Sequence, residues 1–178
     1  PENYMPFFSP DPGRLLVFTQ GPNAESGDVS VLSLREPAGI AALIRTEYRE
    51  GNSHVSPDGR WVAYQSDESG SPEIYVRSFP DVNRRKELVS LGGGTHPRWW
   101  PAGNELFYRS PQRIMRAVSI RLSPDLVVGP TADLFSTSGY AGNPLGSWTY
   151  DVSPTDGRFL MLKEQTSVDA TPINVVLN

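Results

Sequence analysis

The sequence predicts an all-β fold made of about four similar units, each with four antiparallel strands. The first observation behind this prediction is a turn motif that returns roughly every 45 to 50 residues, a spacing typical of repeat architectures. The second is a short apolar run, a predicted strand, after each copy of the motif. The four copies are Ser9-Pro10-Asp11-Pro12-Gly13, Ser56-Pro57-Asp58-Gly59, Trp100-Pro101-Ala102-Gly103 and Ser153-Pro154-Thr155-Asp156-Gly157.

The first unit covers about residues 1–50, and its predicted strands lie near Met5–Phe8, Arg14–Thr19, Asp28–Leu34 and Ala41–Thr46. Segment 40–49 is ambiguous, because its Ala, Leu, Arg and Glu content also favours a helix. The repeat requires an outer strand at this place. We therefore expect a strand there, with a helix as the alternative.

The second unit, about residues 51–93, has the clearest pattern. Asn52–Val55 leads into the turn, and the β-rich segment Arg60–Gln65 leaves it. In the turn, Pro presets the first position, Asp accepts hydrogen bonds from nearby amides and Gly adopts the positive φ. Glu73–Phe79 alternates apolar and polar residues as a third strand, and Lys86–Val89 is a short fourth.

The last two units repeat this order less completely. The third unit, about residues 94–146, ends in a Gly/Ser/Asn-rich linker over 136–146, and the fourth, about 147–178, is one strand short. The open edge of its last strand, Ile173–Leu177, invites pairing with another chain or with Pro1–Met5. The predicted strands lie near Pro97–Trp99, Glu105–Arg109, Ile114–Arg121, Asp133–Phe135, Trp148–Val152, Arg158–Lys163 and Ile173–Leu177.

Repeated four-stranded units of this kind are typical of β-propeller blades, which pack face to face around an axis. The segment Ser56–Ser66, followed by Glu73–Val76, resembles the repeat of the TolB-type β-propeller family. Tyr150–Met161 and the end Ile173–Asn178 resemble the C-terminal end of propellers appended to bacterial Ser/Thr protein kinases. The resemblance extends to the N-terminal propellers of prolyl-oligopeptidase-like peptidases, and it implies a scaffold rather than a defined activity.

About four blades is the lower limit for a closed ring. An unclosed stack would expose the apolar faces of its end blades to water. Three arrangements cover these faces: a four-bladed ring, a symmetric pair of chains that forms an eight-bladed ring, or additional blades that complete the ring. The missing last strand favours a homo-oligomer or additional blades.

Composition indicates a folded domain, since 38% of the 178 residues are hydrophobic and 20% are charged. The net charge of -4 without a basic stripe argues against a nucleic-acid partner. No apolar run approaches the ~18 residues of a membrane span. The absence of cysteine excludes disulfides and fits either the cytoplasm or the periplasm. A first residue Pro1 in place of Met is typical of a processed piece of a longer chain.

Three kinds of site chemistry find little support in the sequence. His54, Ser56 and Asp58 resemble a hydrolytic triad only by composition, because Asp58 is expected to accept hydrogen bonds within its turn. A zinc site would need both His54 and His96 plus carboxylates from other blades. The loop 66–71 offers oxygen ligands without the spacing of a calcium loop. The sequence thus predicts no catalytic residues, metal or cofactor.

The recurring aromatic residues are predicted to pack between blades. Five side chains on or beside the predicted inner strands are instead expected to bind a ligand at the mouth of the axial channel: His54, Arg98, Trp100, Trp148 and Asp151. The predicted function is a non-enzymatic binding or protein-interaction scaffold with a protein or peptide partner. The alternative is an accessory or sensor propeller of a larger enzyme, either a bacterial Ser/Thr kinase or a prolyl-oligopeptidase-like peptidase.

Overall fold

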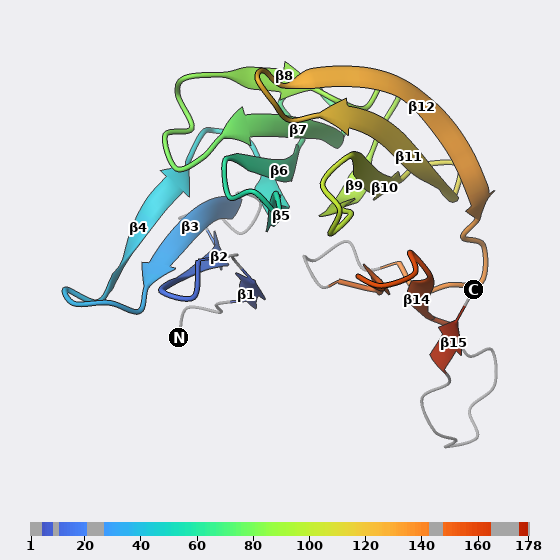
Figure 1. Cartoon of the computed structure of the whole chain (residues 1–178), viewed down its shortest axis with the longest axis horizontal. Coiled ribbons are helices and arrows are strands. Elements are labelled where there is room, and N and C mark those ends of the chain that lie inside the picture. Colours follow the sequence, from blue (N-terminus) through green and yellow to red (C-terminus); the bar gives the residue numbers. More distant parts are fainter. Residues whose placement is uncertain (1–4, 9–10, 21–26, 143–147, 165–174, 178) are drawn as a thin grey trace.

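The computed structural model describes residues 5–8, 11–20, 27–142, 148–164 and 175–177 of the chain. These residues form fifteen strands in four antiparallel sheets, here named blades 1 to 4 in chain order (Figure 1). Within each blade the strands pair in chain order, from an inner strand to an outer one. The all-β propeller fold predicted from the repeat is confirmed.

Blade 1 consists of β1 (Met5–Phe8), β2 (Arg14–Gln20), β3 (Gly27–Ser33) and β4 (Gly39–Ile44). Blade 2 consists of β5 (Glu50–Val55), β6 (Trp61–Ser66), β7 (Glu73–Ser78) and β8 (Lys86–Leu88). Blade 3 consists of β9 (Thr95–Trp99), β10 (Glu105–Arg109), β11 (Ile114–Arg121) and β12 (Val127–Ser136). Blade 4 consists of β13 (Tyr150–Val152), β14 (Phe159–Leu162) and β15 (Val175–Leu177).

In two segments the structure decides or corrects the strand prediction. The ambiguous segment 40–49 contains a strand, because β4 pairs with β3 as the outer edge of blade 1. The last strand of blade 3 was predicted to cover only Asp133–Phe135, yet β12 begins at Val127. Gly129 and Pro130 interrupt its sequence pattern, but an outer strand tolerates proline because one of its edges makes no ladder hydrogen bonds.

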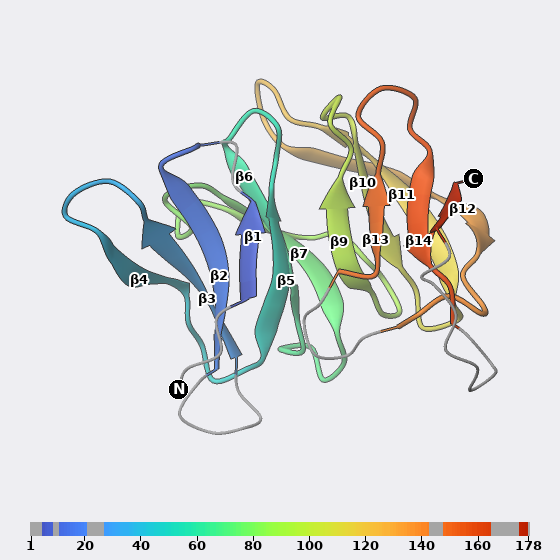
Figure 2. The same ribbon diagram turned by 90° about the horizontal axis from the view of Figure 1, so that it is seen from below.

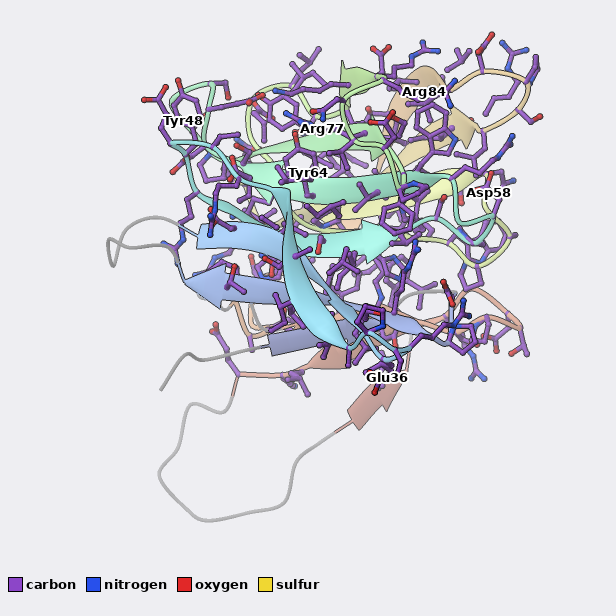
Figure 3. All side chains as sticks on the ribbon, turned by 90° about the vertical axis from the view of Figure 1, so that its left-hand side faces the viewer. Glu36, Tyr48, Asp58, Tyr64, Arg77 and Arg84 are labelled. Atoms are coloured by element: carbon purple, nitrogen blue, oxygen red, sulfur yellow. The ribbon has the colours of Figure 1, made fainter. Side chains whose placement is uncertain are left out.

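The turn motif closes as its residue types predict. In blade 2 the Ser56 hydroxyl donates to Asp58 Oδ1 at 2.6 Å, and the same carboxylate oxygen accepts the Arg60 N–H at 3.1 Å. Gly59 has the positive φ of 70° that the turn requires. Figure 3 shows Asp58 at one end of the blade 2 strands and Tyr48 at the other end. The expected role of Asp58 as a turn acceptor is confirmed.

The inner strands of blades 2 and 3 share an irregularity. The β5 pairing shifts register between Gly51 and His54, and the β9–β10 pairing shifts between Phe107 and Arg109. Asn52 and His96 hold the matching place in the repeat, 44 residues apart, with φ of 49° and 56°. Bulges of this kind change the direction in which neighbouring side chains point. They lie directly before His54 and Arg98 in the sequence.

Three apolar cores hold the blades together, one between each pair of successive blades. The core between blades 1 and 2 includes Leu16, Val29, Val62 and Tyr64, and Arg77 donates to the Tyr64 hydroxyl at 2.9 Å (Figure 3). The core between blades 2 and 3 contains Trp61, Ala63, Trp99, Leu106 and Tyr108 among others. The core between blades 3 and 4 contains Phe107, Met115, Tyr150, Phe159 and Met161 among others.

The repeat explains which strand face enters which core. We number positions with the first residue of each turn motif as position 0. Position 6 is then Leu15, Val62, Leu106 or Phe159, and position 7 is Leu16, Ala63, Phe107 or Leu160. In blades 2 to 4 the position 6 side chain is buried against the preceding blade. In blades 1 to 3 the position 7 side chain is buried against the following blade. Neighbouring positions on a strand point to opposite faces, so one strand serves two cores.

The blades form an open arc, with blades 1 and 4 on the two sides of its opening (Figure 1). Seen from the open side, the inner strands β1, β5, β9 and β13 lie in a row (Figure 2). Among the described residues no apolar core joins blade 4 to blade 1. Over the residues that the structure describes, the four blades therefore form an open part of a propeller.

The connection between blades 3 and 4 is better fixed than its composition predicts. Thr137 is fully buried, and Ala141 N–H donates to the Leu162 carbonyl at 2.8 Å. Glu164 N–H donates to the Gly139 carbonyl, also at 2.8 Å. The first part of the predicted linker is thus bound to the end of β14, while residues 143–147 lie outside the described part of the chain.

Met5 begins β1 in blade 1 and pairs there with Phe18, so it does not extend blade 4. Residues 1–4, for which pairing with the last strand was one expectation, lie outside the described residues. In blade 4, β15 pairs with β14. No helix in the described part of the chain has the length and hydropathy of a membrane span.

Candidate functional site

Three of the five predicted ligand-binding residues hold one place in the repeat. His54, Arg98 and Asp151 each lie two residues before a turn motif, at the ends of β5, β9 and β13. These inner strands are neighbours in the row seen in Figure 2. The repeat therefore brings together side chains that are 44 and 53 residues apart in sequence.

An ion pair joins blades 3 and 4 at this place. Arg98 Nη2 and Nε lie 2.7 and 3.0 Å from Asp151 Oδ1, which also accepts the Val152 N–H at 2.7 Å. The Arg98 side chain is 17% exposed and the Asp151 side chain 56% exposed. The Asp151 carboxylate is therefore partly exposed to solvent beside the largely buried guanidinium of Arg98.

Trp148, two residues before the start of β13, packs against the ion pair and both histidines. The Arg98 guanidinium lies 4.7 Å from the centre of the indole ring, within cation–π range. The rings of His54 and His96 meet Trp148 edge to face, with centroids 6.1 and 6.3 Å away. We name His54, Arg98, Trp148 and Asp151 the axial cluster.

His54 is held as a neutral imidazole. Its Nδ1 accepts the backbone N–H of Trp99 at 2.9 Å, which requires an unprotonated Nδ1. Trp99 also donates its indole Nε1–H to the His54 carbonyl at 3.0 Å. Burial, and to a smaller extent the Arg98 charge, lowers the pKa of His54 to about 3. The ring thus contributes shape and a fixed hydrogen bond rather than charge.

This burial makes folding stability depend on pH. The unfolded chain binds a proton at His54 as the pH falls below the ordinary value of 6.5, whereas the folded chain does so only near pH 3. The free energy of unfolding should therefore decrease as the pH falls from 6.5 towards 3. Urea denaturation just above and just below the ordinary histidine pKa should show this decrease in the wild type. It should be smaller in His54→Asn, whose side chain can accept the Trp99 N–H but does not titrate. Equal pH dependence in the two proteins would contradict this assignment.

Trp100, the fifth predicted site residue, lies apart from the axial cluster. It packs against the core between blades 3 and 4, and its backbone closes the turn by accepting the Gly103 N–H at 2.8 Å. Its indole ring lies beside Gly157, in the neighbouring turn of blade 4. The sequence could not show that Trp100 lies outside the axial cluster. The other three copies of the motif begin with serine, so the repeat gives no orientation for a tryptophan side chain at this position.

A pocket of about 310 Å³ adjoins the axial cluster. It is lined by Arg98, Trp148, Thr149, Tyr150, Asp151, Leu160 and Leu162. Sequence reasoning missed Thr149, Tyr150, Leu160 and Leu162 as site residues. Leu160 could have been found from the repeat, because it holds position 7 and therefore lies on the face of blade 4 that is opposite blade 3.

The hydroxyl groups in the pocket are engaged by the protein. The Tyr150 hydroxyl lies 2.6 Å from the His96 carbonyl and 3.3 Å from that of Phe107, and burial raises the pKa of Tyr150. Thr149 Oγ1 accepts a hydrogen bond from Arg109 at 3.3 Å. Both hydroxyls are thus held in place by hydrogen bonds within the protein.

The residues considered from sequence for catalysis or metal binding make other interactions in the structure. The Ser56 hydroxyl is bound to Asp58 and to the Trp61 N–H, within the turn. In the loop 66–71, Asp67 Oδ1 accepts the Arg49 N–H at 2.9 Å. In the described segments, no three His, Asp or Glu side chains lie close enough together to hold a metal ion.

No protein-family model matches the chain. Solved structures do. TolB from Acinetobacter baumannii is 14% identical with a TM-score of 0.66, over 93% of this chain and 38% of TolB. An auxiliary nutrient binding protein from Bacteroides thetaiotaomicron is 9% identical with a TM-score of 0.60, over 89% of this chain and 42% of that protein.

A prolyl endopeptidase is 16% identical with a TM-score of 0.53, over 91% of this chain and 26% of the enzyme. The predicted resemblance to TolB-type and prolyl-peptidase propellers is thus found at the level of structure. At such low identity the matches show a TolB-like β-propeller fold and not a shared function. The chain spans less than half the length of each of these three proteins.

Proposed function

We propose that the chain is a non-enzymatic binding module, in which the axial cluster and its pocket receive a protein or peptide partner. The observation that carries this proposal is the pocket of about 310 Å³, with an exposed Asp151 carboxylate at its edge and Trp148, Leu160 and Leu162 in its wall. A mostly apolar cavity with a few fixed polar groups is the usual form of a ligand site.

The chemistry of the cluster supports binding over catalysis. A general base needs a free nitrogen with a pKa near the working pH, whereas His54 Nδ1 is occupied and its pKa is depressed to about 3. Arg98 is already paired with Asp151 and stacked on Trp148. These groups are fixed in one geometry, which favours recognition of a complementary surface.

The second candidate function is an accessory or sensor propeller of a larger enzyme, in which another domain performs the chemistry. The observation that favours it is the match to a prolyl endopeptidase, in which the aligned part is 26% of the enzyme. Peptidase and esterase assays of this chain alone should be blank under both proposals. In either case the open arc requires completion, by a second copy or by additional blades.

A displayed peptide library, selected against the full chain, tests the leading proposal. The selected peptides should bind Asp151→Asn and Trp148→Ala at least about 10-fold more weakly than the wild type, because each change removes a central contact of the site. Binding can be measured by fluorescence anisotropy. Unchanged affinity in both variants would remove the axial cluster from the binding site.

The chain offers a matched control for Asp151→Asn. On the outer side of blade 3, Arg116 Nε lies 2.7 Å from Asp133 Oδ1, with side-chain exposures of 21% and 56%. This ion pair resembles Arg98–Asp151 in distance and exposure but does not line the pocket. Asp133→Asn should leave peptide affinity unchanged, which separates loss of the site from a general loss of surface charge.

A further inference from the structure

One face of blade 4 is exposed, although the equivalent face of each other blade is buried. At position 7, Leu16, Ala63 and Phe107 are at most 4% exposed, each in the core with the following blade. Leu160 holds the same position in blade 4 and is 37% exposed. The neighbouring Leu162, on the same face of β14, is 41% exposed. This face thus has the composition of half an inter-blade core, and none of the described blades packs against it as the other half.

Blade 1 carries the complementary half. At position 6, Val62, Leu106 and Phe159 are buried against the preceding blade, whereas Leu15 is only partly buried. Leu15 pairs with Leu32, and Leu32 pairs with Ile40, so the three side chains form a row across blade 1. Leu32 is also partly buried, and Ile40 is 45% exposed. The row faces away from blade 2, because Leu16 at the next position packs there.

Between the described parts of blades 1 and 4, the two half-cores do not meet. Leu15 and Leu160 belong to none of the three cores, and blades 1 and 4 flank the opening of the arc (Figure 1). One copy of the chain therefore presents a position 7 face at one end and a position 6 face at the other. Such a pair of unlike faces forms a head-to-tail contact, which closes when the rotation between copies allows it.

We propose that a second copy of the chain covers the face of blade 4, with its blade 1 packed on Leu160 and Leu162. Two copies then make two identical contacts, and their eight blades form a ring at the upper end of the usual range of about four to eight. Leu15 of the second copy enters the wall of the pocket, which is incomplete without it. This inference rests on the proposed function because it names a partner for the same pocket, but its test does not depend on peptide binding.

Sedimentation of the full chain at micromolar concentration tests the assembly. The wild type should sediment with twice the mass of one chain. Leu160→Glu should weaken association by about 100-fold or more, because it places a charge at both contacts. Leu91→Glu is the matched control, since Leu91 is 79% exposed and lies at the outer side of blades 2 and 3. Far-UV circular dichroism checks that each variant is folded.

Charge rescue distinguishes the proposed contact from any other dimer. Leu15→Arg alone should dissociate the pair as Leu160→Glu does. The double variant Leu15→Arg/Leu160→Glu places opposite charges against each other at both contacts and should restore a large part of the association. A wild type that sediments as one copy overturns the proposal. Association that is unchanged by Leu160→Glu, or not recovered in the folded double variant, overturns it as well, whether or not peptides bind the axial cluster.

Discussion

Trp99→Ala should lower the free energy of unfolding by about 3 to 5 kcal/mol, the usual cost of removing a large buried aromatic side chain. Trp99 is 1% exposed and lies in the core between blades 2 and 3, next to Trp61, Leu106 and Tyr108. Its indole N–H also donates to the His54 carbonyl, which ties blade 3 to blade 2. The substitution removes both the packing and this hydrogen bond.

Urea denaturation followed by tryptophan fluorescence or circular dichroism measures this loss. Trp99→Phe should fall between the wild type and Trp99→Ala, because the ring fills most of the space but cannot donate to His54. Leu91→Ala should change stability by no more than about 0.5 kcal/mol, as expected at an exposed position away from the cores. A loss of less than about 1 kcal/mol in Trp99→Ala would contradict the assigned core.

Arg109→Met should cost about 2 to 4 kcal/mol, because it strips a buried donor group from several acceptors at once. Arg109 is 6% exposed and makes no ion pair with a described carboxylate. Its guanidinium instead donates to the carbonyls of Thr137, Tyr140 and Ala141 and to Thr149 Oγ1. Burial lowers the pKa of Arg109, and these acceptors offset the cost of holding the charge there.

The loss should concentrate in blade 4, because Arg109 fastens residues 137–141 to β10 and thereby positions β13 and β14. Hydrogen exchange should become faster in Tyr150–Val152 and Phe159–Leu162 than in blade 2. Arg109→Lys should recover only part of the stability, since an ammonium group lacks the planar fork. Arg158→Met, at the exposed Arg158–Asp156 pair of the same blade, should change stability by at most about 1 kcal/mol. If Arg109→Met and Arg158→Met were equally mild, Arg109 would have no special role.

The fold was predictable because its signals are local and repeated. Each turn motif combines Pro, an acceptor and Gly, and the apolar run after it alternates between two cores, as Val62 and Ala63 show. The strand at Gly39–Ile44 illustrates the limit of composition, which favoured a helix there while the repeat required a strand. The length of β12 escaped prediction because Gly129 and Pro130 signal a break, although an edge strand accommodates them.

The axial cluster was only partly predictable. His54, Arg98 and Asp151 share a repeat position, so their proximity follows from the architecture. The contact of Trp148 with Arg98 and both histidines depends on the path of the chain before β13, which has no repeat signal. Trp100 could not be excluded from the cluster by sequence, since only the structure shows that its ring turns into the core between blades 3 and 4.

The structural matches have low sequence identity, so they establish the fold and not the function. TolB, a nutrient binding protein and a prolyl endopeptidase share this architecture at 9 to 16% identity with the chain. The proposed function therefore rests on the pocket and on the exposed end faces of blades 1 and 4, and not on these matches. The connection to bacterial Ser/Thr kinases, expected from the resemblance of the last segment, stays a prediction.

In the proposed pair of chains, the end faces of the arc meet between copies, which places Leu15 of one chain near Leu160 of the other. The chain contains no cysteine, so Leu15→Cys/Leu160→Cys introduces the only two thiols. A bis-maleimide of about 10 Å, the spacing of packed sheets, should join them between two chains and give a covalent dimer under denaturing conditions. Mass spectrometry of the digested product should identify the linked peptides. A link formed within single chains, or no link at all, would contradict the open arc completed by a second copy.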